Sequence, residues 1–200
     1  MKKILSSFLL FFIVFSSFEL KAVAYSTDPK KFIEEIIDEA KIILSSSSDQ
    51  NTKAKKLSDI ALKTVDIKGL AYYTIGKKRK EISSDELNKY EKLFEKYFLK
   101  SFTSRLTDYS DPKIAVLSAE AVSEKYTIVK TVLIKTDKKP EVKIDWRVYT
   151  KDPNNPLIRD LIVEGLSLAR TQKEEFSSIL GANNGDINVL FQNLEKFINQ

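Results

Sequence analysis

The chain has 200 residues, no cysteine, no histidine, 42% hydrophobic residues and a net charge of +5. This composition excludes disulfides, a lipid-modified cysteine, Ser-His and Cys-His nucleophilic pairs, and metal sites built from imidazole or thiolate ligands. The net charge is small and the basic clusters are interleaved with acids, so nucleic acid is not favoured as a partner. The length suits one domain at ~150 residues per domain.

The N-terminal segment has the pattern of a cleavable secretory signal peptide. Two lysines precede an apolar run at 4–18, and a small-residue cleavage site, Ala-Val-Ala, follows at 22–24. The run is shorter than the ~20 residues that a membrane-spanning helix needs. We therefore expect residues 1–24 to be a signal peptide, residues 25–200 to form a single domain, and the mature protein to work outside the cytoplasm.

Two helices are expected after this segment. Asp28 and Pro29 form a typical helix start, and apolar residues then recur at spacings of three and four over 32–44. A serine-rich break separates this helix from a second one expected over 52–65. The stretch 66–76, with glycine towards both ends, is expected to be less regular.

A long third helix is expected over 85–106, where Ser83 and Glu86 form a capping box at its start. Its apolar and aromatic residues form a wide stripe: Leu87, Tyr90, Leu93, Phe94, Tyr97, Phe98, Phe102 and Leu106. The spacing of this stripe indicates one buried face of a helix.

The pattern then changes to that of strands, expected over 113–122, 125–136, 141–150 and 157–164. In the third of these, alternation places Val142, Ile144, Trp146 and Val148 on one face and polar residues on the other. Two helices follow, one starting at Ser167 or Thr171 and ending near Leu180, the other over 187–198. This order predicts an α+β domain with a four-stranded antiparallel sheet flanked by N-terminal and C-terminal helices.

Few residues suggest catalysis. We interpret Glu164-Gly165 as a turn in which glycine allows positive φ, and Ser167 as a helix N-cap. Asn184-Gly185-Asp186 lacks the alternating oxygen ligands of a calcium loop and is interpreted as a turn. One alternative stays open: a small α+β cavity enzyme that uses carboxylates such as Asp145 or Glu164.

Several local patterns, taken in order, resemble the MlaC family of periplasmic phospholipid carriers. The residues that carry the resemblance are Val65-Asp66-Ile67-Lys68-Gly69-Leu70-Ala71, then Ile75-Gly76-Lys77, then Ile162-Val163-Glu164-Gly165-Leu166-Ser167-Leu168, and finally Phe176 and Ile179-Leu180. The likeness covers nearly the whole mature chain. It departs at Lys78-Arg79 and at Gln172-Lys173, where family members often have aromatic residues or Tyr-Arg.

The resemblance implies a curved sheet and helices that enclose an apolar cavity (an MlaC-like or NTF2-like fold) in which the acyl chains of a phospholipid sit. Pattern alone would favour an ordinary dry core, and the resemblance reverses that preference. The residues expected to line the pocket are Leu70, Tyr73, Ile75, Phe94, Tyr97, Phe98, Phe102, Leu106, Val142, Ile144, Trp146, Val148, Ile162 and Leu166.

The resemblance also implies a biological role. The protein would be a periplasmic monomer without catalytic activity or cofactor, carrying phospholipid between an outer-membrane lipoprotein complex and an inner-membrane ABC transporter complex to maintain outer-membrane lipid asymmetry. A non-ligand-binding periplasmic adaptor with a solid core is a further alternative.

Four adjacent cations, Lys77, Lys78, Arg79 and Lys80, stand beside the Gly-Lys segment. Runs of this kind usually form solvated surface. In a chain of small net charge we expect this one to belong to a surface for a partner or a lipid headgroup.

Overall fold

The computed structural model describes residues 24–107, 111–136 and 140–200. Its helices are α1 (Pro29–Ser45), α2 (Gln50–Thr64), α3 (Ile67–Ile75), α4 (Ser84–Leu106), α5 (Leu168–Ala182) and α6 (Ile187–Asn199), with a 3-10 turn η1 (Gly76–Lys80). Its strands are β1 (Ile114–Ser123), β2 (Tyr126–Leu133), β3 (Val142–Tyr149), β4 (Leu157–Val163) and β5 (Leu166–Ser167). The expected α+β class is confirmed. The expected signal peptide, apart from Ala24, lies outside the described residues.

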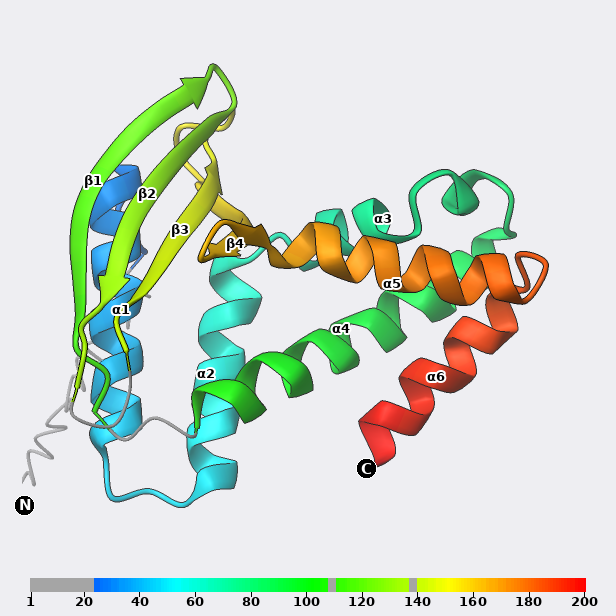
Figure 1. The fold of residues 1–200 in the computed structure, drawn as a ribbon, viewed down its shortest axis with the longest axis horizontal. Coiled ribbons are helices and arrows are strands. Elements are labelled where there is room, and N and C mark those ends of the chain that lie inside the picture. Colours follow the sequence, from blue (N-terminus) through cyan, green and yellow to red (C-terminus); the bar gives the residue numbers. More distant parts are fainter. Residues whose placement is uncertain (1–23, 108–110, 137–139) are drawn as a thin grey trace, which may run out of the picture.

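The described part of the chain is elongated, with the sheet at one end and helices at the other (Figure 1). The strands follow chain order in one antiparallel sheet, in which the two-residue β5 adds a fifth strand to the four expected. Helix α1 packs against β1 and β2, and α2 packs against α1 and α4. At the far end α4 packs against α3 and α6, while α5 connects this end to β4. Helix α4 therefore joins the two ends.

Side-chain caps fix where the helices begin, as the sequence predicts. The Asp28 carboxylate accepts from the Lys31 amide at 2.9 Å, with Pro29 in the first turn of α1. The Ser83 hydroxyl accepts from the Glu86 amide, and the Glu86 carboxylate accepts from the Ser83 amide. These contacts satisfy amides that have no partner within the helix, so the starts of α1 and α4 are set locally.

The stretch 66–76, expected to be irregular, forms α3. Asp66 caps this helix by accepting from the Gly69 amide at 2.9 Å, and the same carboxylate accepts from Arg159 Nε at 2.6 Å. A Cβ on Gly69 would lie 2.2 Å from Asp66 Oδ2. The expectation was wrong because glycine, which weakens most helices, is needed here to make room for the cap.

The sheet register confirms that Val142, Ile144, Trp146 and Val148 share one face, called here the inner face, which covers the core. The expected place of Ile162 in the pocket is corrected by the register. Ile162 pairs with Asp145 and so lies on the outer face of the sheet, whereas Ile144 lies on the inner face. Three consecutive apolar residues in β4 hide the two-residue period of the strand. The register places Leu161, which pairs with Trp146, on the inner face.

The Glu164-Gly165 turn is structural, as expected. Both residues have positive φ, 49° and 82°, which matches a two-residue hairpin turn. The Glu164 amide donates to the Lys143 carbonyl at 3.0 Å, and the Lys143 amide donates to the Glu164 carboxylate. Ser167 caps α5 by accepting from the Arg170 amide. These contacts close the sheet and start the next helix.

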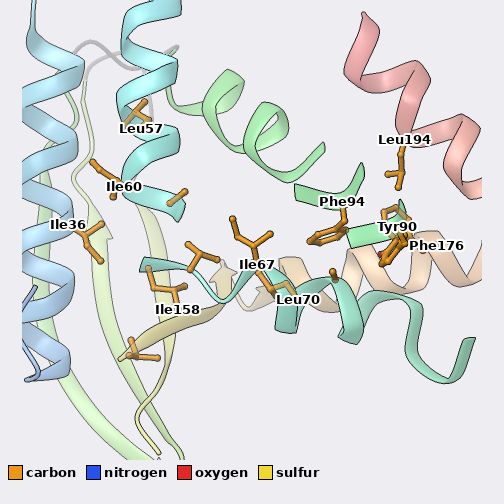
Figure 2. Packing of buried hydrophobic residues seen from close by; sticks show 14 of the residues in the cluster. Ile36, Leu57, Ile60, Ile67, Leu70, Tyr90, Phe94, Ile158, Phe176 and Leu194 are labelled. Carbon is orange, nitrogen blue, oxygen red and sulfur yellow. The ribbon is translucent and has the colours of Figure 1, made fainter. Parts of the chain in front are cut away.

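The apolar core runs the length of the molecule (Figure 2). Near the sheet it contains Ile36, Leu57, Ile60 and Ile158, and at the helical end Tyr90, Phe94, Phe176 and Leu194. Ile67 and Leu70 of α3 lie between these groups. The fold therefore depends on α3 for continuity between its two ends.

Candidate apolar binding site

Along the inner face of β3, burial falls from the C-terminal end of the strand towards its N-terminal end. Val148 is completely buried (0% exposed), whereas Ile144 and Val142 on the same strand are only partly buried. Val142 pairs with Leu133, and Leu133 pairs with Ile114; both partners are partly buried too. Apolar side chains at this end of the sheet are thus left incompletely covered.

The aromatic stripe of α4 shows the same gradient. Tyr90 and Phe94 are 0% and 2% exposed, but Phe98, Phe102 and Leu106 are partly buried. The Phe98 and Phe102 rings stack with centroids 5.8 Å apart, as residues four apart on one helix face can. The stripe therefore leaves the tightly packed core over the C-terminal half of the helix.

Both gradients run towards the segment that joins α4 to β1. Leu106 and Ile114 are eight residues apart in the sequence, which limits the distance between them to at most about 29 Å. The C-terminal half of α4 lies beside α2, which in turn packs against α1 (Figure 1). We call the two partly buried surfaces the apolar walls: Phe98, Phe102 and Leu106 of α4, and Ile114, Val116, Leu133, Val142, Ile144, Trp146 and Leu161 of the sheet.

Polar atoms within the walls are satisfied inside the sheet. The Trp146 indole N–H donates to Thr131 Oγ1 at 3.0 Å, and that hydroxyl donates to the Ile144 carbonyl at 2.8 Å. The ring faces of Trp146 are therefore free to make apolar contacts. Among the described residues no group of three or more acids could hold a metal ion. Walls of this composition suit an apolar ligand rather than acid-base chemistry.

The structure divides the residues expected to line one pocket. Six lie in the apolar walls: Phe98, Phe102, Leu106, Val142, Ile144 and Trp146. Leu70, Ile75, Phe94 and Val148 are buried in the core, and Tyr97 packs against Phe176 and Phe197 while donating to Gln172 at 2.7 Å. Burial raises the pKa of the Tyr97 hydroxyl.

Three of the expected residues lie apart from the walls. Ile162 is on the outer sheet face, whereas Tyr73 and Leu166 are 42% and 58% exposed. The sequence interpretation also missed four wall residues, Ile114, Val116, Leu133 and Leu161. The alternation of Ile114 and Val116 in the first predicted strand was the available signal.

Two surface hollows lie outside the walls. One, of about 690 Å³, is between α3 and α5 and is lined by Tyr73, Arg170, Lys173, Glu174, Ser177 and Ser178. The other, of about 480 Å³, is on the outer sheet face, where Asp145 and Glu164 meet Lys130 and Lys143. The carboxylates considered for an enzyme therefore lie on the side of the sheet opposite the walls.

The expected basic segment is η1. Lys77, Arg79 and Lys80 are exposed there, while Lys78 is partly buried and pairs with Glu81 at 3.4 Å. The segment follows α3 at the helical end of the molecule, away from the sheet and the apolar walls (Figure 1).

Comparison with known proteins assigns the family. The family model described as "MlaC protein" matches residues 30–196. The chain belongs to the MlaC family. The chain is also similar to a solved structure, that of the phospholipid-binding protein from Ralstonia solanacearum in complex with a phospholipid, with a TM-score of 0.72 and 18% sequence identity. The match covers 88% of this chain and 97% of that one. No curated protein matches the chain in sequence.

The MlaC assignment confirms the resemblance found in the sequence, and the structural match shows that the fold is shared. The apolar walls are thus a feature of an MlaC-type α+β domain. No helix in the described part of the chain is long and apolar enough to cross a bilayer.

Proposed function

We propose that this MlaC-family protein binds a phospholipid by holding its acyl chains between the apolar walls. The observation that carries the proposal is the incomplete burial of Phe98 and Phe102 on α4 and of Ile144 and Trp146 on β3, at the end of the sheet where both surfaces leave the core. The Ralstonia solanacearum protein with the same fold was solved with a phospholipid.

The energetics favour such a ligand. Each methylene removed from water contributes ~0.8 kcal/mol, so a diacyl lipid with about 30 methylenes would cost on the order of 20 kcal/mol to expose. A carrier must supply apolar surface to offset this cost. The walls supply aromatic and aliphatic side chains, and the acyl chains would in turn cover wall residues that the protein leaves partly exposed.

The finer proposal concerns the route of the lipid. We propose that the protein is exported by its signal peptide to the periplasm, where it carries phospholipid as a monomer between an outer-membrane lipoprotein complex and an inner-membrane ABC transporter complex. Such a carrier needs no catalytic residue and no cofactor. It must hold lipid about as well as a bilayer does, so that a small conformational change can release it.

The test is the lipid content of the purified protein. The full chain is expressed in a bacterial host, the mature protein is purified and extracted with organic solvent, and phospholipid is measured by mass spectrometry. We expect near-stoichiometric phospholipid. Phe102→Asp, which places a charge in the α4 wall, should lose it, whereas Leu166→Asp at a position 58% exposed should keep it. Lipid-free wild-type protein would refute the proposal and favour an adaptor or an enzyme.

A further inference from the structure

Five cations, from two segments that are distant in the sequence, lie where α3 and η1 adjoin the first two turns of α5. Lys77, Arg79 and Lys80 come from η1, and Arg170 and Lys173 come from α5; these five residues are called the basic face. Helix α5 packs against α3, and a Cβ on Gly76 would lie 3.7 Å from Lys173 Cε. The start of η1 is therefore in contact with α5, beside the hollow that Arg170 and Lys173 line.

Two tyrosines hold cations in place on this face. The Lys173 ammonium lies 4.8 Å from the centre of the Tyr73 ring, and the Arg79 guanidinium lies 5.7 Å from the centre of the Tyr72 ring. Such cation-π contacts orient a charged group without neutralising it. Tyr73 itself is 42% exposed, so it presents an aromatic edge and a hydroxyl within the basic face.

The positive charge of the face is largely uncompensated. None of its five cations forms an ion pair with an acid in the described ranges. Lys78 pairs with Glu81, and Lys68 pairs with Glu91 at 3.0 Å, so those two acids are engaged by other lysines. Glu174 is the acid that lines the shared hollow. The face therefore attracts anions.

We propose that the basic face binds the surface of a bilayer that contains anionic phospholipids. Clustered lysines and arginines are a common means of binding anionic membranes, and exposed tyrosine suits the headgroup region. Lys77 and Lys80 are exposed lysines on flexible stems, which suits a fluid layer of headgroups better than the fixed carboxylates of a protein. The η1 segment, which supplies three of the five cations, is remote from the apolar walls (Figure 1). This proposal therefore goes beyond lipid carriage and does not depend on it.

The experiment measures sedimentation of the mature protein with vesicles of phosphatidylcholine alone or with about 30% phosphatidylglycerol. We expect binding only to the anionic vesicles, and its loss when salt rises to about 0.5 M. Each cation contributes a factor of about five to partitioning, so K77E/R79E/K80E should bind at least about a hundredfold more weakly.

The matched control is K55E/K56E/K63E, which makes the same change in net charge at exposed lysines of α2. It should bind within a few-fold of wild type. Circular dichroism of both variants checks that they fold, and their phospholipid content should equal that of wild type. Equal loss in both variants, or wild-type protein that ignores the anionic vesicles, would overturn the proposal. The second outcome would point instead to an acidic protein as the ligand of the face.

Discussion

Ile144→Trp on β3 tests whether the inner sheet face holds lipid. Ile144 is partly buried, pairs with Thr131 and Val163, and lies in the sheet wall. The indole adds about six non-hydrogen atoms, which would displace about four or five methylenes of an acyl chain at ~0.8 kcal/mol each. The lost ~3 to 4 kcal/mol corresponds to a lipid affinity lower by about two to three orders of magnitude. Lipid content should fall sharply.

A dry core would respond in another way. Overpacking costs ~1 to 3 kcal/mol of folding stability, and in a domain of this size each kcal/mol lowers the melting temperature by about 2 to 4 °C. If the walls form a lipid site, the indole should enter the space of the acyl chains with little loss of folding stability. In a lipid site the substitution lowers the bound lipid and leaves stability nearly unchanged, whereas in a dry core it lowers stability and leaves the bound lipid unchanged. Stability is measured after lipid removal, because bound lipid itself raises the melting temperature.

Two matched variants calibrate the measurement. Ile162→Trp makes the same substitution on the outer face and should leave lipid content unchanged. Val148→Trp introduces the indole at a fully buried position of the same strand and should lower the melting temperature. The assay combines phospholipid mass spectrometry of the purified protein with thermal unfolding of the delipidated protein. Our placement of the site is refuted if Ile144→Trp melts several degrees lower while its lipid content matches wild type.

Two further predictions concern the contacts that position the sheet and helices. Gly69→Ala should lower the free energy of unfolding by ~1 to 3 kcal/mol, measured by denaturant unfolding, because the added Cβ would displace the Asp66 carboxylate that caps α3 and pairs with Arg159. Alanine normally stabilises a helix by ~1 kcal/mol relative to glycine, so a stabilised variant would contradict this prediction. Ser167→Ala should lower the free energy of unfolding by ~2 to 3 kcal/mol, since it removes both the α5 cap and the 2.6 Å hydrogen bond to the buried Asp160 carboxylate. Ser167→Thr keeps the hydroxyl and should lower the stability less. Equal losses of stability in the two variants would exclude the hydroxyl as the cause.

Much of the fold could be predicted because its signals are local. The capping box of Ser83 and Glu86 sets the start of α4 through residues three apart, and the alternation from Val142 to Val148 sets the inner face of β3 through neighbours two apart. The resemblance to the MlaC family rests likewise on short patterns in a fixed order. Each of these signals lies within a few residues of the structure that it predicts.

The errors arise where distant contacts decide the outcome. Helix α3 depends on Arg159, whose guanidinium holds the Asp66 cap from across the fold. The face occupied by Ile162 depends on its pairing with Asp145, which a run of three apolar residues does not reveal. The partnership of η1 with Lys173 likewise requires α5 to pack on α3. Periodicity within one segment contains no information on these pairings.

The same long-range packing explains why the walls stay apart. Helix α4 has 23 residues and is therefore about 35 Å long. Its first half is fixed in the helical core, where Phe94 packs edge-on against Phe176 and Tyr90 is fully buried. The sheet is fixed by α1, so neither surface can close on the other without bending a helix or leaving its own core. Under the proposed function, acyl chains would cover the apolar side chains that both surfaces leave partly exposed, which removes apolar area from water without any rearrangement of the two cores.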